Sequence, residues 1–277
     1  MERKDNLQPL VSIILATFNE PVDMISQSIR SVLDQDYPRI ELIISDDSTE
    51  AATISAIDQF ALQDKRVHII RHKERMGFVN ALNFALQASK GELIARMDGD
   101  DMSMPNRISL QVAYAQAHPD IDVFGGSMYI IDAENHVISE RTYPTTARKI
   151  NRMFMVRSPF AHPTLMFRRT IIDKGIMYNP EYKRAEDIDF YMRLYQSKYH
   201  FGNLPEKILK YRVVGNLDTK RPKEQWYYNH KARKRFIKSK PFFSCVSYLV
   251  SLGYKYVPNF IVARYYKKEN SKYKSSS

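Results

Sequence analysis

Short apolar runs alternate with helical repeats along the first hundred residues of the chain. Runs of strand length occur at Val11–Ala16, Glu41–Ile44, Val67–Ile70 and Leu93–Ala95. Between them, apolar residues recur at helical spacing: Ile25, Ile29, Val32 and Leu33, then Ile54, Ile57 and Ala61, then Val79, Leu82, Ala85 and Leu86. Strands that are apolar at every position are typical of a parallel sheet covered by helices on both faces. We therefore predict a doubly wound α/β fold, in which ligands bind at the carboxyl ends of the strands.

Polar residues follow three of the predicted strands, at Thr17–Glu20, Ser45–Ser48 and Asp98–Asp101. In a parallel sheet these ends lie on one rim, so their acidic side chains are expected to share one site. Clustered carboxylates repel each other unless a cation is present, and Mg²⁺ usually shares its ligand shell with substrate phosphates. The pattern favours a cation site for a phosphorylated ligand, and an acidic surface turn is the alternative.

The pattern changes after Pro105, where the strict alternation of strand and helix ends. The predicted elements are a helix through Ile108, Val112 and Ala115, a hairpin of Met128–Ile131 and His136–Arg141 around Glu134-Asn135, and a helix from Ala185 through Phe190 and Leu194.

Basic residues are concentrated near the C-terminus of this 277-residue chain. The formal net charge of +11 divides into −2 over residues 1–218 and +13 over residues 219–277. We predict an α/β domain over 1–218 and a basic, aromatic-rich helical extension over 219–277. The extension contains the uncharged stretch Pro241–Tyr254, which is shorter than the roughly 20 apolar residues that span a bilayer.

Basic, aromatic-rich segments of this kind suit the surface of an anionic membrane. Packing of the extension on the α/β domain and binding of nucleic acid are the alternatives. The single cysteine, Cys245, excludes an internal disulfide framework, and Met1–Pro9 holds no apolar leader segment. We therefore expect a cytoplasmic protein.

Six motifs resemble the family 2 glycosyltransferases over roughly residues 10–215. In chain order they read VSIILATFNE, ISDDS, ALNFALQASKGELIARMDGDD, PNRI, HPTLMFR and AEDIDFYMRL. The resemblance implies the GT-A fold, a Rossmann-like, doubly wound and mostly parallel sheet. It also implies inverting transfer of a sugar from a nucleotide diphosphate, here expected to be UDP, with Mn²⁺ or Mg²⁺. The Gln-x-x-Arg-Trp motif of processive polysaccharide synthases does not occur, so one sugar per acceptor is expected.

The resemblance assigns donor-binding roles to residues after the first two strands. Phe18 matches the position where the family stacks an aromatic ring on the uracil, and an aromatic face suits a base. Thr17 and Glu20 lie in the same turn and are predicted to bind the donor with it. Asp46 is expected to accept hydrogen bonds from the base or ribose. Asp47 is either part of this group or an N-cap of the following helix.

Asp98 and Asp100 match the Asp-x-Asp pair of the family. Asp100 is the predicted direct metal ligand, and Asp98 is predicted to bind the ribose, or the metal through water. Asp101 is expected to cap a helix or support its neighbours. Arg107 is included in the donor site, although a supporting role behind the acidic loop is equally compatible with the resemblance, as it is for Asn83.

Inverting transfer also needs a base that takes the proton of the acceptor hydroxyl. Glu186 and Asp187 match the Glu-Asp pair of the family, and we expect Asp187 to be the base and Glu186 to shape the acceptor site. Two acids placed at a helix N-terminus by its dipole are the alternative. His162, in the His-Pro-Thr motif, is included among the site residues, and Arg212 is considered as a contact of the diphosphate.

The expected acceptor is a lipid-linked saccharide of capsule or O-antigen assembly, with the protein peripheral at the inner face of the cell membrane. A sugar-phosphate nucleotidyltransferase is an alternative with similar metal chemistry. It normally carries a Gly-rich basic loop where this chain has Ala16–Glu20. A nucleic-acid-binding protein that uses the basic extension is the other alternative, but no recognised nucleic-acid-binding motif accompanies it.

Overall fold

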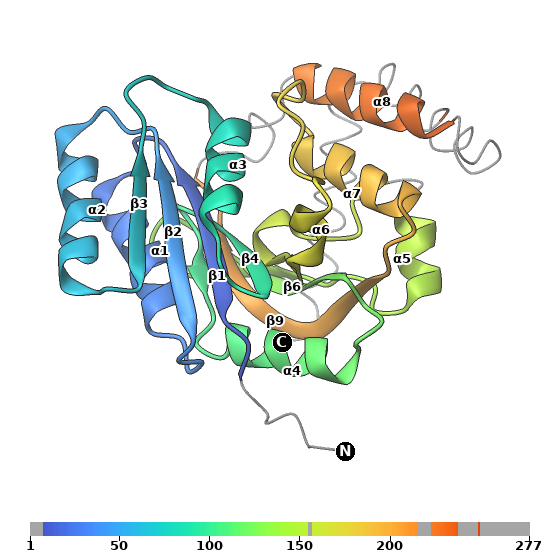
Figure 1. Ribbon diagram of the computed structural model, residues 1–277, viewed down its shortest axis with the longest axis horizontal. Coiled ribbons are helices and arrows are strands. Elements are labelled where there is room, and N and C mark those ends of the chain that lie inside the picture. The colour runs from blue at the N-terminus through green and yellow to red at the C-terminus, as the bar shows by residue number, and fades with distance from the viewer. Residues whose placement is uncertain (1–7, 155–156, 215–222, 238–248, 250–277) are drawn as a thin grey trace.

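The computed structural model describes residues 8–154, 157–214, 223–237 and 249. Its centre is a nine-stranded sheet in the order β3-β2-β1-β4-β8-β6-β9-β5, with β7 paired to β6 (Figure 1). The strands are β1 (Val11–Thr17), β2 (Ile40–Asp46), β3 (Val67–Arg71), β4 (Leu93–Asp98), β5 (Met102–Ser103), β6 (Val123–Ile131), β7 (Val137–Arg141), β8 (Met166–Arg168) and β9 (Phe201–Arg212).

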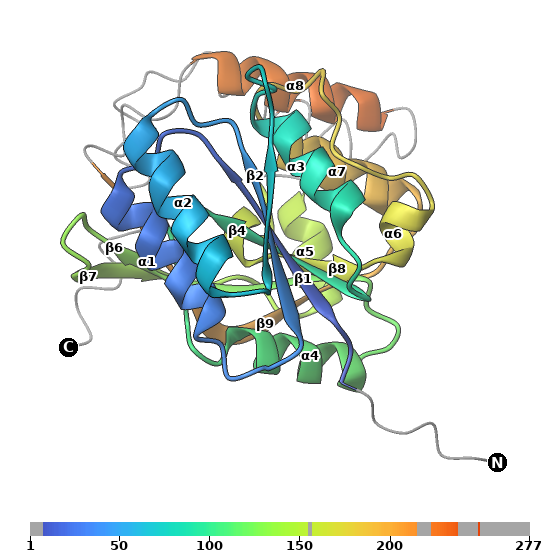
Figure 2. The ribbon, with the colours of Figure 1, turned by 60° about the vertical axis from the view of Figure 1, so that its left-hand side comes forward.

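Helices cover both faces of this sheet. They are α1 (Val22–Leu33), α2 (Ala51–Gln63), α3 (Phe78–Ala88), α4 (Arg107–Ala117), α5 (Ala147–Phe154), α6 (Thr170–Asp173), α7 (Glu186–Gln196) and α8 (Lys223–Ile237), with a 3₁₀ turn η1 at His162–Thr164. Figure 2 shows β1 and β2 between α1 and α2 on one side and α3 on the other. The predicted doubly wound α/β arrangement is confirmed.

The first four predicted strands form the parallel half of the sheet, as expected. β1 pairs in parallel with β2 and with β4, and the register places Thr17 beside Asp46 and Ala16 beside Asp98. The carboxyl ends of these three strands therefore lie on one rim. The predicted convergence of their polar ends is confirmed.

The second half of the sheet is mixed. β8 is antiparallel to β4 and β6, whereas β9 runs parallel to β6. The predicted hairpin is present as β6 and β7, and its turn contains Asn135 at φ 72°, a left-handed conformation that asparagine tolerates better than most residues. The short strand β5 follows Asp98–Asp101 in the sequence and pairs with β9. Strand β9 therefore lies next to the acidic residues that follow β4.

Two apolar clusters pack on opposite faces of the sheet, because successive residues of each strand point to opposite sides. On β1, Ile14 joins the cluster under α3 and α7, whereas Ile13 and Leu15 join the cluster under α1 and α2. All three side chains are at most 1% exposed. Burial on both faces explains why the strands read as continuous apolar runs.

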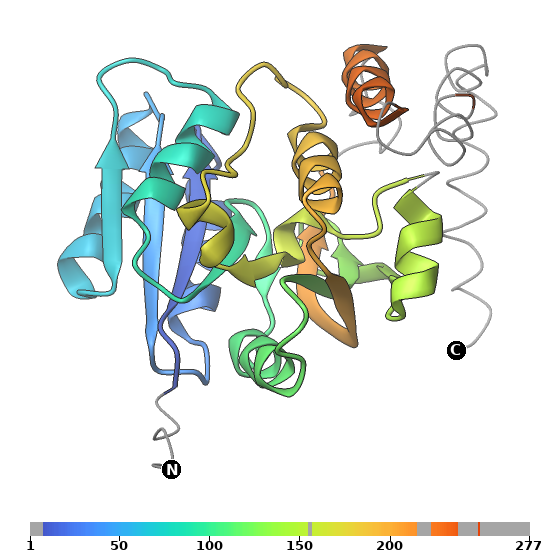
Figure 3. The same ribbon diagram turned by 45° about the vertical axis from the view of Figure 1, so that its right-hand side comes forward.

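Helix α8, the start of the predicted basic extension, packs on α7 (Figures 1 and 3) and bonds the last residue of α5. Ala232 is buried, and Arg233 donates a hydrogen bond to the carbonyl oxygen of Phe154 at 2.8 Å. The ring of Tyr228 lies 6.1 Å from that of Tyr182, in the loop before α7. Packing on the body, one of the alternatives for the extension, is therefore observed for α8. Apart from Leu249, the predicted segment Pro241–Tyr254 lies outside the described residues.

Within the described ranges, the model contains no helix that is both long and apolar enough to cross a bilayer.

Candidate active site

The acidic loop after β4 brings Asp98, Asp100 and Asp101 together, with ligand oxygens within 4.8 Å of one another. Asp101 is fully buried, and one of its oxygens accepts a hydrogen bond from the backbone N–H of Arg212 at 2.8 Å. Its other oxygen is buried without a hydrogen-bond partner among the described residues. Burial, and then the charges of Asp98 and Asp100, raise the pKa of Asp101 well above its usual value.

Arg212 holds this loop from behind. Its Nε donates to the carbonyl oxygen of Asp100 at 2.8 Å, and its Nη2 donates to Gln27 at 2.9 Å. Its Nη1 reaches the carbonyl oxygens of Asp132 and Ala133. Arg212 is 1% exposed, so the contact with a diphosphate considered from the sequence does not fit this geometry. The guanidinium instead joins two segments of backbone and the side chain of Gln27.

Arg96 lies under Asp98, two residues earlier on the same face of β4. Both terminal nitrogens of its guanidinium contact the Asp98 carboxylate, with Nη1 donating to Oδ2 at 2.5 Å. Arg96 is 3% exposed, whereas the Asp98 side chain is 22% exposed. Asp98 therefore stands between Arg96 and the solvent.

Arg107 lies on the opposite side of β4, at the start of α4. It donates to Gln111 at 3.0 Å and to the carbonyl oxygen of Arg96 at 2.8 Å, and it is 1% exposed. Burial, and then the positive charge of Arg96, lower the pKa of Arg107 to about 9. This position favours the supporting role of Arg107 over direct contact with a donor.

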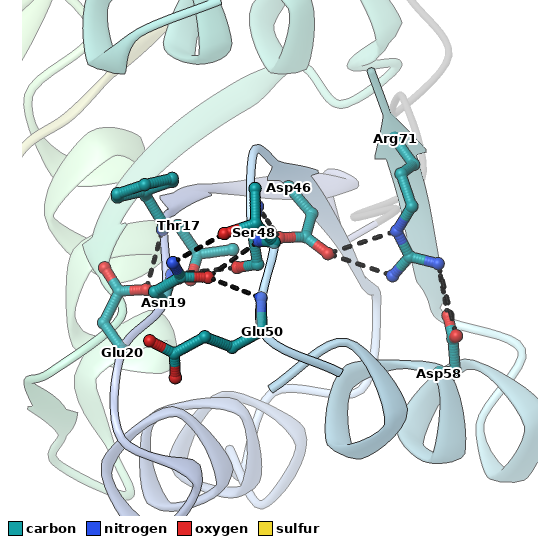
Figure 4. A network of polar contacts seen from close by, with 10 residues as sticks. Thr17, Asn19, Glu20, Asp46, Ser48, Glu50, Asp58 and Arg71 are labelled. Atoms are coloured by element: carbon teal, nitrogen blue, oxygen red, sulfur yellow. Dashed lines mark hydrogen bonds and ion pairs between the residues drawn. The ribbon is translucent and has the colours of Figure 1, made fainter. Parts of the chain in front are cut away.

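The turn after β1 is closed by Glu20 (Figure 4). Its carboxylate accepts hydrogen bonds from the Thr17 hydroxyl and from the backbone N–H of Phe18, the latter at 2.8 Å. Burial raises the pKa of Glu20, with a further contribution from Asp98. Asn19, at φ 57°, accepts hydrogen bonds from the backbone N–H groups of Thr49 and Glu50. The turn is thereby fixed to the loop after β2.

Asp46 is buried at the end of β2, where both of its carboxylate oxygens have protein partners. One oxygen accepts a hydrogen bond from the backbone N–H of Ser48, and the other pairs with Arg71 of β3 at 2.9 Å (Figure 4). Asp47 does not cap α2, whose N-cap is Glu50. Instead Asp47 accepts a hydrogen bond from the backbone N–H of Gly77 at 2.7 Å, and its other oxygen is buried without a partner among the described residues.

Phe18, the predicted platform for the base, has a cation on its face. The guanidinium carbon of Arg75 lies 3.6 Å from the centre of the Phe18 ring. Arg75 is exposed, in the loop between β3 and α3. Guanidinium groups and nucleobases both stack on aromatic faces, so Arg75 covers or flanks the surface expected to receive the base.

The second acidic group lies at the start of α7. Ala185 adopts a left-handed conformation at φ 56° and turns the chain into the helix, whose first residues are Glu186 and Asp187. His162 approaches Glu186, with 3.7 Å between Nδ1 and Oε1, and its Nε2 lies 2.8 Å from the Tyr178 hydroxyl. The Tyr178 backbone is fixed by two hydrogen bonds to the Asn83 side chain.

Burial controls the protonation of these groups. It holds the pKa of His162 well below its usual range, with a further contribution from Arg96, so the imidazole is neutral. Burial, and then the Asp187 carboxylate, raise the pKa of Glu186 to about 8. The charges of Arg96 and Asp98 also act on the pKa of Glu186, so the acidic loop and the start of α7 are close enough to interact electrostatically.

The acidic loop fits a hard divalent cation, because its ligand atoms are carboxylate oxygens and the neighbouring Oδ2 of Asp101 is buried without a partner among the described residues. Asp98 and Asp100 are the residues that would hold the ion. A second group, Asp132, Glu134 and His136, lies in the β6–β7 turn. Its Asp132 carboxylate is already bonded to the backbone of that turn, and Glu134 and His136 are exposed.

Three neighbours of the site had no predicted role: Arg96, Arg75 and Tyr178. Only the first carries a signal in the sequence, because residues two apart on a strand share a face and Arg96 precedes Asp98 by two. Arg75 and Tyr178 reach the site through long-range packing.

Comparison with known proteins identifies the family of this chain. The model of glycosyl transferase family 2 matches residues 12–176. The O-antigen biosynthesis glycosyltransferase WbnJ of Escherichia coli is 33% identical over 210 residues, which cover 74% of this chain and 80% of WbnJ. The uncharacterized glycosyltransferase MJ1057 of Methanocaldococcus jannaschii is 29% identical over 240 residues, which cover 85% of this chain and 82% of that protein.

Solved structures share the fold. Residues 1–349 of S. aureus TarS in complex with UDP-GlcNAc give a TM-score of 0.66 at 21% identity, covering 83% of this chain and 67% of that one. The mannosyltransferase PcManGT from Pyrobaculum calidifontis, in complex with GDP-Man and Mn²⁺, gives 0.63 at 18% identity, covering 92% and 72%. In the longer TarS structure, the matched region is 40% of the chain.

The fold and the site together define a glycosyltransferase of the GT-A class. The chain belongs to glycosyl transferase family 2. Membership of this family decides against the nucleotidyltransferase and the non-catalytic nucleic-acid-binding protein.

Proposed function

We propose that this enzyme transfers one sugar from a UDP-sugar to a saccharide acceptor during assembly of a surface polysaccharide, with inversion and with a divalent cation. The observation that carries the proposal is the meeting of two acidic groups in one site. The Asp98–Asp101 loop offers carboxylate oxygens suited to a cation and a diphosphate, and Glu186 and Asp187 lie within electrostatic reach of it.

Asp187 is the proposed base. As the acceptor oxygen bonds to the anomeric carbon, the bond from that carbon to the diphosphate breaks, and the hydroxyl proton passes to the Asp187 carboxylate. Asp100 and Asp98 would hold a divalent cation, which would stabilise the negative charge that develops on the diphosphate. Glu186, with its raised pKa, is protonated at neutral pH and orients the acceptor by donating a hydrogen bond.

UDP is the proposed nucleotide, with the base over Phe18 and the diphosphate at the acidic loop. The TarS complex contains UDP-GlcNAc, whereas the PcManGT complex contains GDP-Man, so GDP is the main competitor. Asp46 and Asp47 are the proposed contacts of the base or ribose. The buried Asp47 oxygen without a partner among the described residues supports Asp47, and Arg71 holds Asp46 in place.

A lipid-linked acceptor and a peripheral position at the inner face of the membrane remain part of the proposal. They are supported by the net charge of +13 over residues 219–277 and by the role of WbnJ in O-antigen biosynthesis. Flotation of the full chain with vesicles that contain anionic lipid tests this point. If the protein still binds the vesicles after removal of residues 238–277, another surface of the protein binds the membrane.

The first experiment is a thermal-shift titration with UDP and GDP, each with and without Mn²⁺. A ligand that binds only the folded state raises the midpoint by mass action. We expect metal-dependent stabilisation by UDP that is lost in Asp100→Asn. Glu134→Gln, in the exposed acidic group of the hairpin turn, is the matched control and should respond like the wild type.

Three outcomes separate the possibilities. A stronger response to GDP than to UDP would replace the donor and leave the rest of the proposal intact. No response to either nucleotide, or an unchanged response in Asp100→Asn, would refute it. If UDP binds, release of UDP from a panel of UDP-sugars then identifies the donor sugar.

A further inference from the structure

Arg96 forms a closed pair with Asp98 inside the acidic site. Both terminal nitrogens of the guanidinium contact the two carboxylate oxygens, and Asp98 is the only hydrogen-bond partner of the guanidinium within the part of the chain that the structure describes. Its Nε is buried and has no partner there. An arginine has five donors, so this one is held mainly by Asp98.

Arg96 cannot leave this position easily. It is 3% exposed, its guanidinium carbon lies 5.6 Å from the centre of the Phe78 ring, and its backbone is central in the sheet between β1 and β8. A buried guanidinium stays charged over the whole physiological pH range. The site therefore contains a permanent positive charge beneath its acidic loop.

This charge acts on the carboxylates that would hold a metal. The pair uses both oxygens of Asp98, so a cation that approaches Asp98 competes with Arg96 for the same atoms. The positive charge of Arg96 also acts on Asp101, on the other side of the group. A free divalent ion that binds Asp98, Asp100 and Asp101 thus meets three carboxylates, and the positive charge of Arg96 already offsets one of their negative charges.

We propose that Arg96 is a positioning residue that makes divalent-metal binding depend on the nucleoside diphosphate. It acts through Asp98 and lowers the affinity of the acidic loop for the free ion. The diphosphate brings the negative charges and oxygen ligands that the loop lacks, so ion and nucleotide bind together. This inference rests on the proposed function, because it assumes that ion and diphosphate share the site.

The consequence is a strong, reciprocal coupling between the two ligands. If UDP raises the affinity for Mn²⁺ by some factor, Mn²⁺ must raise the affinity for UDP by the same factor. Without Arg96, the three carboxylates bind the free ion more tightly, and the coupling shrinks. A role of Arg96 confined to packing would change stability but would leave the coupling unchanged.

The test is a titration of Mn²⁺ followed by the electron paramagnetic resonance signal of the free ion, with and without UDP. In the wild type we expect UDP to raise the Mn²⁺ affinity at least about tenfold, within the usual range of coupling energies. In Arg96→Gln, which keeps an amide donor toward Asp98, we expect the affinity without UDP to rise by about fivefold or more. The coupling factor should fall by the same ratio.

Two controls define the effect. Arg96→Lys keeps the charge and should retain the coupling to within about threefold, although lysine lacks the bidentate geometry. Arg66→Met removes an equal charge from the ion pair with Asp64 at the surface and should change nothing. Circular dichroism establishes that each variant is folded before the titration.

Each result has a definite reading. If wild-type protein shows no response to UDP and Mn²⁺ together, the proposed function itself fails. If it responds but binds Mn²⁺ equally well without UDP, the inference about Arg96 is overturned without any variant. If Arg96→Gln keeps the wild-type coupling, Arg96 is a structural residue only. Should Arg96→Gln fail to fold, loss of coupling in folded Arg96→Lys would likewise overturn the inference.

Discussion

Arg212 offers the sharpest test of how the acidic loop is held. Replacement by methionine keeps most of the side-chain volume but removes the donors to Asp100, Asp132, Ala133 and Gln27. The backbone N–H that bonds Asp101 is unchanged by the substitution. The variant therefore measures the contribution of the guanidinium group alone.

The expected loss can be worked from these contacts. A hydrogen bond from a charged donor contributes about 1.5–3 kcal/mol, and a buried acceptor left without a partner costs a similar amount. The carbonyl groups of Asp132 and Ala133 lie in a half-buried turn and can bond to water instead. The contacts to Asp100 and Gln27 then account for most of the effect, and we expect Arg212→Met to lower the free energy of unfolding by about 3–5 kcal/mol.

Urea unfolding measures this value, and a UDP titration with Mn²⁺ measures the site. Arg212→Lys should also be destabilised, because a single ammonium cannot reach three separate segments. Arg39→Met is the control, since Arg39 is exposed and its guanidinium donates, among the described residues, only to the carbonyl oxygen of Gln8. If Arg212→Met unfolds within about 1 kcal/mol of the wild type yet loses UDP affinity, Arg212 binds the diphosphate and the bracing role is refuted.

Three further predictions concern α7 and α8. Asp187→Asn should lower transfer by about 10²–10⁴-fold while UDP and Mn²⁺ still bind, and a variant with near wild-type turnover would exclude Asp187 as the base. Because the folded-state pKa of Glu186 is raised from 4.5 to about 8, the wild type should lose stability as pH rises from about 4.5 to 8. Glu186→Gln should flatten that slope in urea unfolding at several pH values, whereas an equal slope in both proteins would contradict it. Arg233→Met should cost about 1–3 kcal/mol, because it leaves the Phe154 carbonyl oxygen without its donor; an unchanged unfolding curve would mean that this hydrogen bond does not stabilise the domain.

Local rules were sufficient to predict the parallel half of the fold. Strands β1, β2 and β4 are buried on both faces, each is followed by a helical stripe, and the polar residues begin where the strand ends. The register of β1 with β2 and β4 then brings Thr17, Asp46 and Asp98 to one rim. These features depend on residues close in sequence, and sequence patterns carry that information well.

The partner of each side chain could not be predicted in this way. Asp46 pairs with Arg71, 25 residues away, and Arg212 bonds the Asp100 backbone across 112 residues. Such contacts depend on strand order in the mixed half of the sheet, where β9 lies beside β6 and β5. Hydrophobic periodicity does not determine that order. The sequence therefore does not show that Arg212 supports the acidic loop and does not contact a ligand.

The rim also contains buried polar atoms that lack partners among the described residues. One oxygen each of Asp47 and Asp101 and the Nε of Arg96 are in this state, at the ends of β2 and β4. Each such atom typically costs about 1–3 kcal/mol, which a fold built for stability alone would avoid. All three lie on the rim where the nucleotide and the ion are proposed to bind, and a ligand that supplies donors and charge there recovers part of that cost. The same loops are held rigidly by Asn19, Arg71 and Arg212, so the site is prepared for its ligand at the expense of the stability of the free protein.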